Sequence, residues 1–207
     1  MPIMMERDLE ILKFINKFGF CEMQHLDKYF QLKKPNNYQI MRRLKKAGWI
    51  QQQQVFSKKS AYWLNKSTTK KIGSSIPAIN KPPVAIYTHE VLLIDLYLKL
   101  KEQFDNANFI SEREIIRDKY FEGFGKKGHV ADGLLIFQDK KVVAIELELT
   151  LKSAKRIEHI FRAYKKNLEI DEIWYFCDDK IFNVISRRSE DQSHIKVHHF
   201  QEYLSAK

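Results

Sequence analysis

The chain has 207 residues, 44% of them hydrophobic and 13% aromatic, with only 7 glycines and 5 prolines, which provides for packed cores and excludes a fibrous or disordered chain. It has no apolar run near the ~20 residues of a membrane span, no signal-peptide pattern and two cysteines without metal-binding spacing, so we expect a cytoplasmic protein without a membrane partner. The formal net charge of +10, with a pI of about 9.4, favours a polyanionic partner.

The net positive charge comes entirely from the N-terminal third of the chain. Residues 1–72 contain 15 Lys and Arg against 5 Asp and Glu, whereas residues 73–207 contain 21 of each. No acidic residue lies between Asp27 and Glu90. This segregation predicts a polyanion-binding module joined to a domain with another role. A basic domain without such a partner is the alternative.

The basic segment has the pattern of three helices followed by a hairpin. Apolar residues at helical spacing predict helices over 6–18 and 23–30, and Pro35 opens a third helix that ends at Gly48. Two strand-like segments follow, 49–56 and 61–64, joined by a basic turn. This layout resembles a winged helix-turn-helix, in which the third helix enters the major groove and the hairpin contacts flanking phosphates.

The third helix and the hairpin supply the predicted DNA-binding residues. Asn, Gln and Arg side chains can make paired hydrogen bonds to base edges, and lysines neutralise phosphates. The predicted contacts to double-stranded DNA are Asn36, Gln39, Arg42, Arg43, Lys46, Lys58 and Lys59. A winged helix used for protein contacts is the alternative.

Residues 73–84 are rich in Gly, Ser and Pro and predict a linker between domains 1–72 and 85–207. After the linker, helical and strand-like patterns alternate, so we expect a mixed α/β (α+β) protein. The predicted helices are 88–104, 153–168 and 180–188, and the predicted strands are 108–112, 129–137, 142–151, 172–177 and 195–200. The segment 123–128, GFGKKG, lacks the spacing of a phosphate-binding loop, so we expect no nucleotide cofactor.

Acidic residues gather on the hairpin formed by the second and third of these strands. A period of two places Glu146, Glu148 and Lys152 on one strand face, and hairpin pairing brings Asp132 towards Glu146. Converging carboxylates suit Mg²⁺ or Mn²⁺, and such an ion can activate water and stabilise a phosphodiester transition state. Alternating Leu and Glu also fits a half-exposed antiparallel strand without chemistry.

The order α–β–β–β–α–β, with Asp132 on the second strand and Glu146 and Glu148 on the third, resembles the PD-(D/E)xK nuclease superfamily. Glu148 stands where that motif has lysine, and Lys152 is the candidate replacement on the same face. The run HVADGLLIF…VVAIELELTLKSAKRIEHIFRAY, with the preceding helices and linker, resembles the replication-relaxation family. That family is similar to MobC-type plasmid mobilisation proteins and relaxases.

The resemblance implies a restriction-endonuclease-like second domain that acts in plasmid or mobile-element mobilisation or replication. It implies a metal-dependent DNA-nicking relaxase or nuclease with Asp132, Glu146 and Glu148 as metal ligands and catalytic acids, assisted by Lys152. Partners would be double-stranded DNA and other mobilisation or replication proteins. The alternative is a non-catalytic DNA-binding accessory or regulatory protein with a vestigial nuclease fold.

Four further residues near these acids are candidates for the same site. Glu112 or Glu114, which precede the hairpin in the sequence, is the candidate for an additional acid at the site. His129 either orients a ligand or is an ordinary strand-end histidine. Tyr164, which a relaxase could use as a nucleophile, has the helical phase of a core residue.

Overall fold

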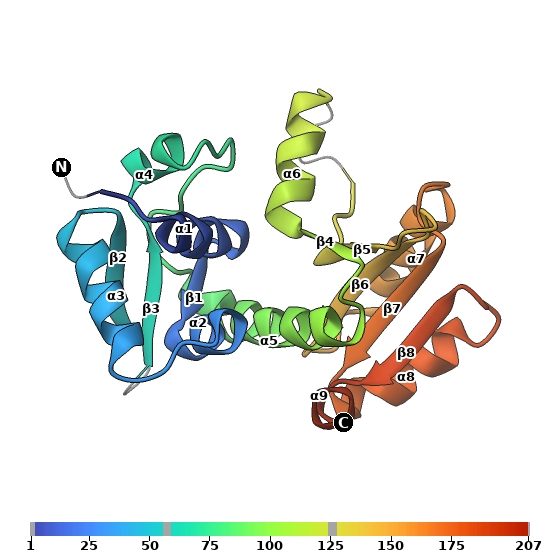
Figure 1. Ribbon diagram of the computed structural model, residues 1–207. Coiled ribbons are helices and arrows are strands. Elements are labelled where there is room, and N and C mark those ends of the chain that lie inside the picture. The colour runs from blue at the N-terminus through green and yellow to red at the C-terminus, as the bar shows by residue number, and fades with distance from the viewer. Residues whose placement is uncertain (1–2, 56–58, 124–127, 207) are drawn as a thin grey trace. The chain divides into compact units, whose positions relative to one another are not determined.

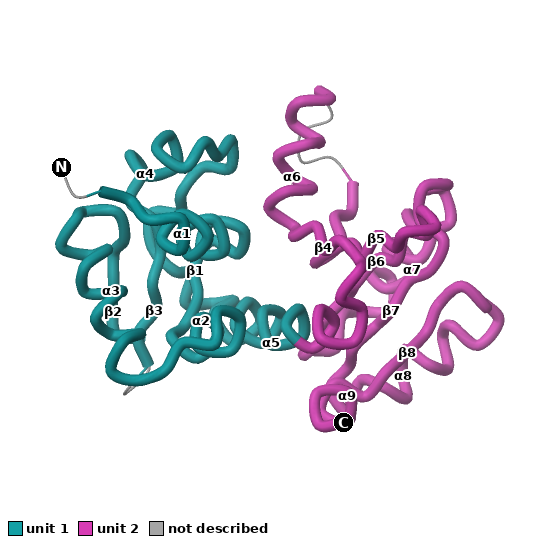
Figure 2. Tube along the Cα trace, viewed as in Figure 1, with its two compact units in different colours: residues 1–98 teal, residues 99–207 magenta. Residues whose placement is uncertain are grey.

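The computed structural model describes residues 3–55, 59–123 and 128–206 (Figure 1). The predicted contact Lys58 and most of the segment 123–128 lie outside the described residues. The chain divides into two compact units, Met1–Leu98 and Lys99–Lys207 (Figure 2). It is a mixed α/β protein with two separate sheets, which confirms the predicted fold class at that level.

The first unit consists of helices around a small antiparallel sheet with the strand order β1-β3-β2. Its sequence-predicted helices and strands are present with ends shifted by a few residues, and β1 and α4 are additional. The elements are α1 (Glu6–Phe18), β1 (Phe20–Glu22), α2 (Met23–Phe30), α3 (Asn36–Lys46), β2 (Ile50–Val55), β3 (Lys59–Leu64), α4 (Lys66–Lys71) and the 3₁₀ turn η1 (Val84–Ile86).

Aromatic packing explains why the first unit extends past the predicted linker into helix α5 (Tyr87–Gln103). Tyr87 stacks on Phe20, with ring centroids 4.9 Å apart, and both belong to one buried cluster with Trp63 and Val91. The Trp63 indole N–H also donates to the carbonyl of Asn80, at 3.1 Å. Residues 73–84 therefore pack on the first unit, and the division between the units falls later, within α5.

The second unit is built on a five-stranded sheet with the order β4-β5-β6-β7-β8. Strands β4, β5 and β6 are antiparallel, whereas β7 and β8 run parallel to β6. After α5 the elements are β4 (Asn108–Ser111), α6 (Glu112–Phe121), β5 (Gly133–Ile136), β6 (Val142–Glu148), α7 (Ala154–Lys165), β7 (Glu172–Cys177), α8 (Asp179–Ser189), β8 (Ile195–His199) and α9 (Phe200–Ser205).

The second unit departs from the predicted elements at α6, at the ends of two strands and at the additional helix α9. Helix α6 was not predicted; Ser111 and Glu114 form a capping box at its start, and none of its residues is buried. The predicted strand 142–151 ends at Glu148, because the parallel pairing with β7 stops at the Glu148–Cys177 pair and Ser153 then caps α7. The predicted strand 129–137 is likewise shortened to β5.

Strand register places the acids and the core on one sheet face. Leu134 lies opposite Ala144, and Ile136 lies opposite Val142. Alternation along β6 therefore puts Val142, Ala144, Glu146 and Glu148 on this face. The buried side chains that pack here come mainly from α7 and α8: Ile157, Ile160, Phe161, Tyr164, Ile181 and Ile185. Within the described ranges, no helix has the length and apolar character needed to cross a membrane.

Candidate functional site

Two carboxylates are buried at the C-terminal end of β6. Glu146 is 2% exposed and Glu148 is 4% exposed. Burying a carboxylate without partners is costly, so the contacts of these two side chains show how the fold tolerates them.

Glu146 is held by a histidine and a tyrosine. His129 Nε2 lies 2.6 Å from Glu146 Oε1, and the Tyr164 hydroxyl donates a hydrogen bond to the same oxygen. Burial raises the pKa of Glu146 and outweighs the opposing contact with His129, and the nearby charge of Asp132 raises it further. Burial, reinforced by Glu146, also raises the pKa of Tyr164, so its hydroxyl stays a neutral donor. The predicted core residue Tyr164 is therefore also a partner of the acid.

Asp132 is fixed beside β6 between the two glutamates. Its Oδ2 accepts the backbone N–H of Leu147 at 2.8 Å, and its carbonyl accepts the backbone N–H of Glu112 at 3.1 Å. The backbone around Glu112 thus adjoins Asp132, whereas Glu114 is engaged in the cap of α6. The approach of Asp132 to Glu146, expected from hairpin pairing, is present in the structure.

Lys152 is brought to the same acids from the segment after β6. Its Nζ lies 2.5 Å from Glu148 Oε2, and the lysine is partly buried. Burial alone lowers the pKa of Lys152, but the pair with Glu148 and the charges of Glu146 and Asp132 more than offset it, so the net shift is upward. Lys152 therefore lies within electrostatic range of all three predicted acids, which keep its ammonium group protonated.

A buried hydroxyl next to the acids was not foreseen from the sequence. Tyr175 on β7 lies opposite Glu146, and its hydroxyl has no hydrogen-bond partner among the described residues. Burial raises its pKa, and the charges of Glu146 and Glu148 act in the same direction. A buried polar atom without a partner indicates a water or ligand position. In the sequence, Tyr175 lies within the apolar run IWYFC, where a core role was the only signal.

The side chains at this site determine whether the implied metal ion could bind there. Across residues 3–55, 59–123 and 128–206, no group of three or more His, Cys, Asp or Glu side chains is arranged to hold a metal. Mg²⁺ commonly uses one or two carboxylates and completes its shell with water and substrate phosphates. Asp132 and Glu146 fit that smaller requirement, because both contacts of Glu146 fall on Oε1 and the Tyr175 hydroxyl lacks a partner nearby.

The predicted DNA-binding residues on α3 divide into two groups. Asn36, Gln39, Arg42 and Lys46 are exposed, and Lys59 is exposed at the start of β3. Arg43 differs, because its guanidinium donates to both carboxylate oxygens of Asp8, at 2.7 and 2.6 Å.

The Arg43–Asp8 pair fastens α3 to α1. Burial of Asp8 would raise the pKa of that carboxyl, but the hydrogen bonds from Arg43 and from the Met5 backbone lower it overall. No sequence pattern indicates this pair, since both residues look like solvent-facing charges on separate helices. Arg43 is thus engaged within the first unit, and Lys59, although exposed, lies 3.4 Å from Glu22 Oε2. Asn36, Gln39, Arg42 and Lys46 face solvent.

No protein-family model, curated protein or solved structure matches this chain.

Proposed function

We propose that this chain is a DNA-binding protein of plasmid or mobile-element mobilisation or replication, and that its second unit is a metal-dependent DNA-nicking site. The observation that carries the proposal is the Lys152–Glu148 pair at 2.5 Å, beside Asp132 and Glu146. The nuclease motif that the sequence resembles requires a lysine near two acids. Lys152, paired with Glu148, would supply in space the lysine that position 148 lacks.

The first unit supports the DNA-binding half of the proposal. Its helices and antiparallel hairpin suit a winged helix, and α3 presents Asn36, Gln39, Arg42 and Lys46 to solvent. Residues 1–72 contain three basic residues for every acidic one. Such a surface binds phosphates through counterion release and reads bases through its amide and guanidinium groups.

The roles at the acidic site follow from the contacts. Asp132 and Glu146 would hold Mg²⁺ or Mn²⁺, an ion that, when bound, supplies an activated water and charge stabilisation. His129 and Tyr164 orient Glu146 by contacting its Oε1, so its Oε2 is the oxygen that would bind the metal. Glu148 keeps the Lys152 ammonium in place, where it can donate a hydrogen bond to a phosphate oxygen or to the attacking water.

The test is cleavage of supercoiled plasmid carrying the cognate origin, with and without Mg²⁺ or Mn²⁺. We expect metal-dependent nicking, loss of nicking in Asp132→Ala and Glu146→Ala, and a decrease of about 100-fold in Lys152→Met. Lys155→Met is the matched control, because Lys155 is exposed on α7. Equal nicking by the Lys152 and Lys155 variants would remove the observation on which the proposal rests.

A second candidate function is a non-catalytic DNA-binding accessory or regulatory protein. It is favoured by the fact that each acid already has a protein partner: His129 and Tyr164 for Glu146, Lys152 for Glu148, and the Leu147 N–H for Asp132. On this reading wild type binds DNA, nicks nothing in either metal, and gains no stability from Mn²⁺.

A further inference from the structure

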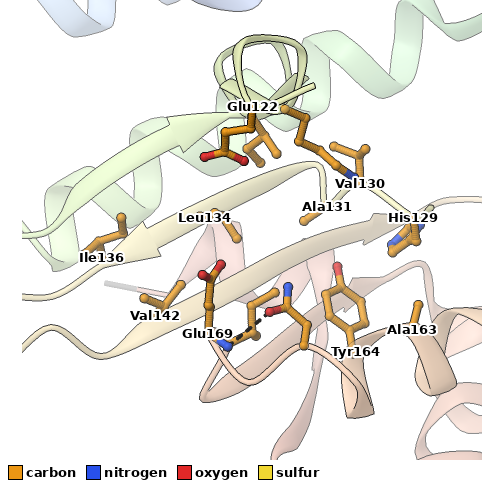
Figure 3. Close-up of a pocket in the computed structure, with 14 residues that line it drawn as sticks. Glu122, His129, Val130, Ala131, Leu134, Ile136, Val142, Ala163, Tyr164 and Glu169 are labelled. Atoms are coloured by element: carbon orange, nitrogen blue, oxygen red, sulfur yellow. Dashed lines mark hydrogen bonds between the residues drawn. The ribbon is translucent and has the colours of Figure 1, made fainter. Parts of the chain in front are cut away.

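A pocket of about 500 Å³ lies between α6 and α7, on the sheet face that carries Glu146. Its floor is apolar and is formed by Leu134, Ile136 and Val142, with Ala163 at one side (Figure 3). These strand residues precede Glu146 on the same face of β5 and β6, so the pocket floor continues the acidic face towards the other end of the hairpin.

The pocket and the acidic site share a wall. His129 and Tyr164 line the pocket (Figure 3). The same two side chains contact Glu146. Their rings meet edge to face, with centroids 5.2 Å apart. A ligand in the pocket would therefore touch the residues that orient the acid.

Polar side chains line the pocket around this floor, and large apolar side chains lie next to them in the sequence. Lys119, Glu122, Asn167 and Glu169 line the pocket and can donate or accept hydrogen bonds. Beside them in sequence are large exposed apolar side chains: Tyr120 is 55% exposed, Phe121 is 74% exposed and Leu168 is 96% exposed. An apolar pocket with a few polar groups is typical of small-ligand sites, and exposed aromatic rings are the usual platform on which unpaired bases stack.

We propose that this pocket receives an unpaired nucleobase of the DNA strand whose phosphate lies at Asp132 and Glu146. The inference rests on the proposed function. A base is tied to its phosphate by one sugar, so a strand held at the acids must place an adjacent nucleotide along the same face. The apolar floor would cover the faces of the base, and the polar groups would meet its edge, as in enzymes that take a base out of the stack.

The experiment uses the full-length chain and an origin oligonucleotide with 2-aminopurine placed singly at successive positions. This base becomes brightly fluorescent when it leaves the stack, and anisotropy of an end label reports DNA affinity in the same sample. With wild type we expect a several-fold rise in fluorescence at one position. Ala163→Phe, which fills the pocket, should abolish the rise while the affinity changes less than about threefold.

Ala154→Phe is the matched control, because Ala154 is exposed on the same helix. Ala163→Met, which adds less volume, replaces Ala163→Phe if circular dichroism shows that the larger variant is unfolded. Equal fluorescence in the Ala163 and Ala154 variants, or no rise at any position with wild type bound, would overturn the base pocket and leave the proposed function standing. If the pocket binds a protein segment instead of a base, no fluorescence rise is expected at any position. Failure of wild type to bind DNA at all would overturn the proposed function and the pocket with it.

Discussion

Arg43, one of the predicted DNA contacts, is engaged in a pair with a buried carboxylate. Asp8 is 1% exposed, and Arg43 supplies two of its hydrogen bonds. Removing one partner of a buried pair leaves the other charge desolvated. Arg42, one residue earlier, is exposed on the face of α3 that we assign to DNA.

We predict opposite consequences for these neighbouring arginines. Arg43→Met should lower the free energy of unfolding by about 2–3 kcal/mol, below the full cost of a broken buried pair because Arg43 itself is partly exposed. Arg42→Ala should change stability by less than about 0.5 kcal/mol and weaken DNA binding by about 1–3 kcal/mol. Denaturant titration and DNA titration of both variants measure the two effects. Similar stability in the two variants would show that the Asp8 pair contributes nothing.

His25 gives the first unit a predictable response to acid. It is fully buried, and its Nδ1 accepts the Glu22 backbone N–H at 3.1 Å. Burial, followed by the charges of Lys28 and Lys59, lowers its pKa from 6.5 to about 3. The unfolded chain therefore binds this proton below about pH 6.5 and the folded chain does so only near pH 3, so the contribution to stability is complete above 6.5 and is lost as the pH falls between these values.

His25→Gln removes the group that titrates. The variant should be less stable than wild type at pH 7, and the difference should shrink steadily between pH 6.5 and pH 4. Urea midpoints at three pH values measure it. A difference that is the same at pH 7 and pH 4 would mean that another group accounts for the acid sensitivity.

At the scale of the elements, the β4–β5 pair depends on a glycine next to Asp132. A Cβ on Gly133 would lie 2.4 Å from the ring of Phe109, far inside van der Waals contact. Gly133→Ala should therefore destabilise the protein by about 1–3 kcal/mol through overpacking. Adding Phe109→Leu should recover part of that loss, and thermal melts of the single and double variants measure both. No recovery in the double variant would place the strain somewhere other than in this contact.

Strand β6 should respond to metal through Glu146. Because the folded-state pKa of Glu146 is raised, its ionisation costs stability as the pH rises above the ordinary value of 4.5. Glu146→Gln should remove that cost and leave the metal-free protein as stable as wild type or more so at neutral pH. Mn²⁺ at tenfold its Kd should stabilise wild type by about 1.5 kcal/mol, and Glu146→Gln should lose most of this gain. Identical Mn²⁺ shifts in the two proteins would favour the non-catalytic function.

Local periodicity predicted the acidic face, because a strand alternates its side chains regardless of what packs around it. Asp132 and Glu146 were brought together by hairpin pairing alone. Helix α6 was missed since it buries no residue and so has no apolar stripe to read. The Asp8–Arg43 pair and the unpartnered Tyr175 hydroxyl depend on how elements distant in sequence pack together. Local sequence patterns do not predict such packing.

At the scale of the whole molecule, the first unit needs residues beyond the basic segment. Ile76 is buried, Asn16 donates to its carbonyl at 3.2 Å, and Tyr87 and Val91 cover Phe20. A fragment ending at residue 72 would expose this apolar surface. The net charge resides in the same unit, so the stability of this unit and its affinity for DNA should decrease together when it is truncated.

We predict that residues 1–98 fold cooperatively and bind duplex DNA with a steep salt dependence, whereas residues 1–72 melt at a clearly lower temperature and bind more weakly. Calorimetry and DNA titration at several salt concentrations compare the fragments. Residues 99–207 alone should bind weakly, because they lack the basic excess. Equal affinity of the second fragment would contradict the assignment of DNA binding to the first unit.

The position of Lys152 bears on how such sites diverge between related chains. Strand alternation ends with β6 at Glu148, yet Lys152, four residues later, reaches Glu148 Oε2 from the segment that follows. A chain with lysine at both positions would keep an ammonium group at the acids. If the proposed nicking site is correct, two single substitutions would therefore transfer the motif lysine from 148 to 152 without loss of the ammonium group, and a glutamate at 148 would become its partner.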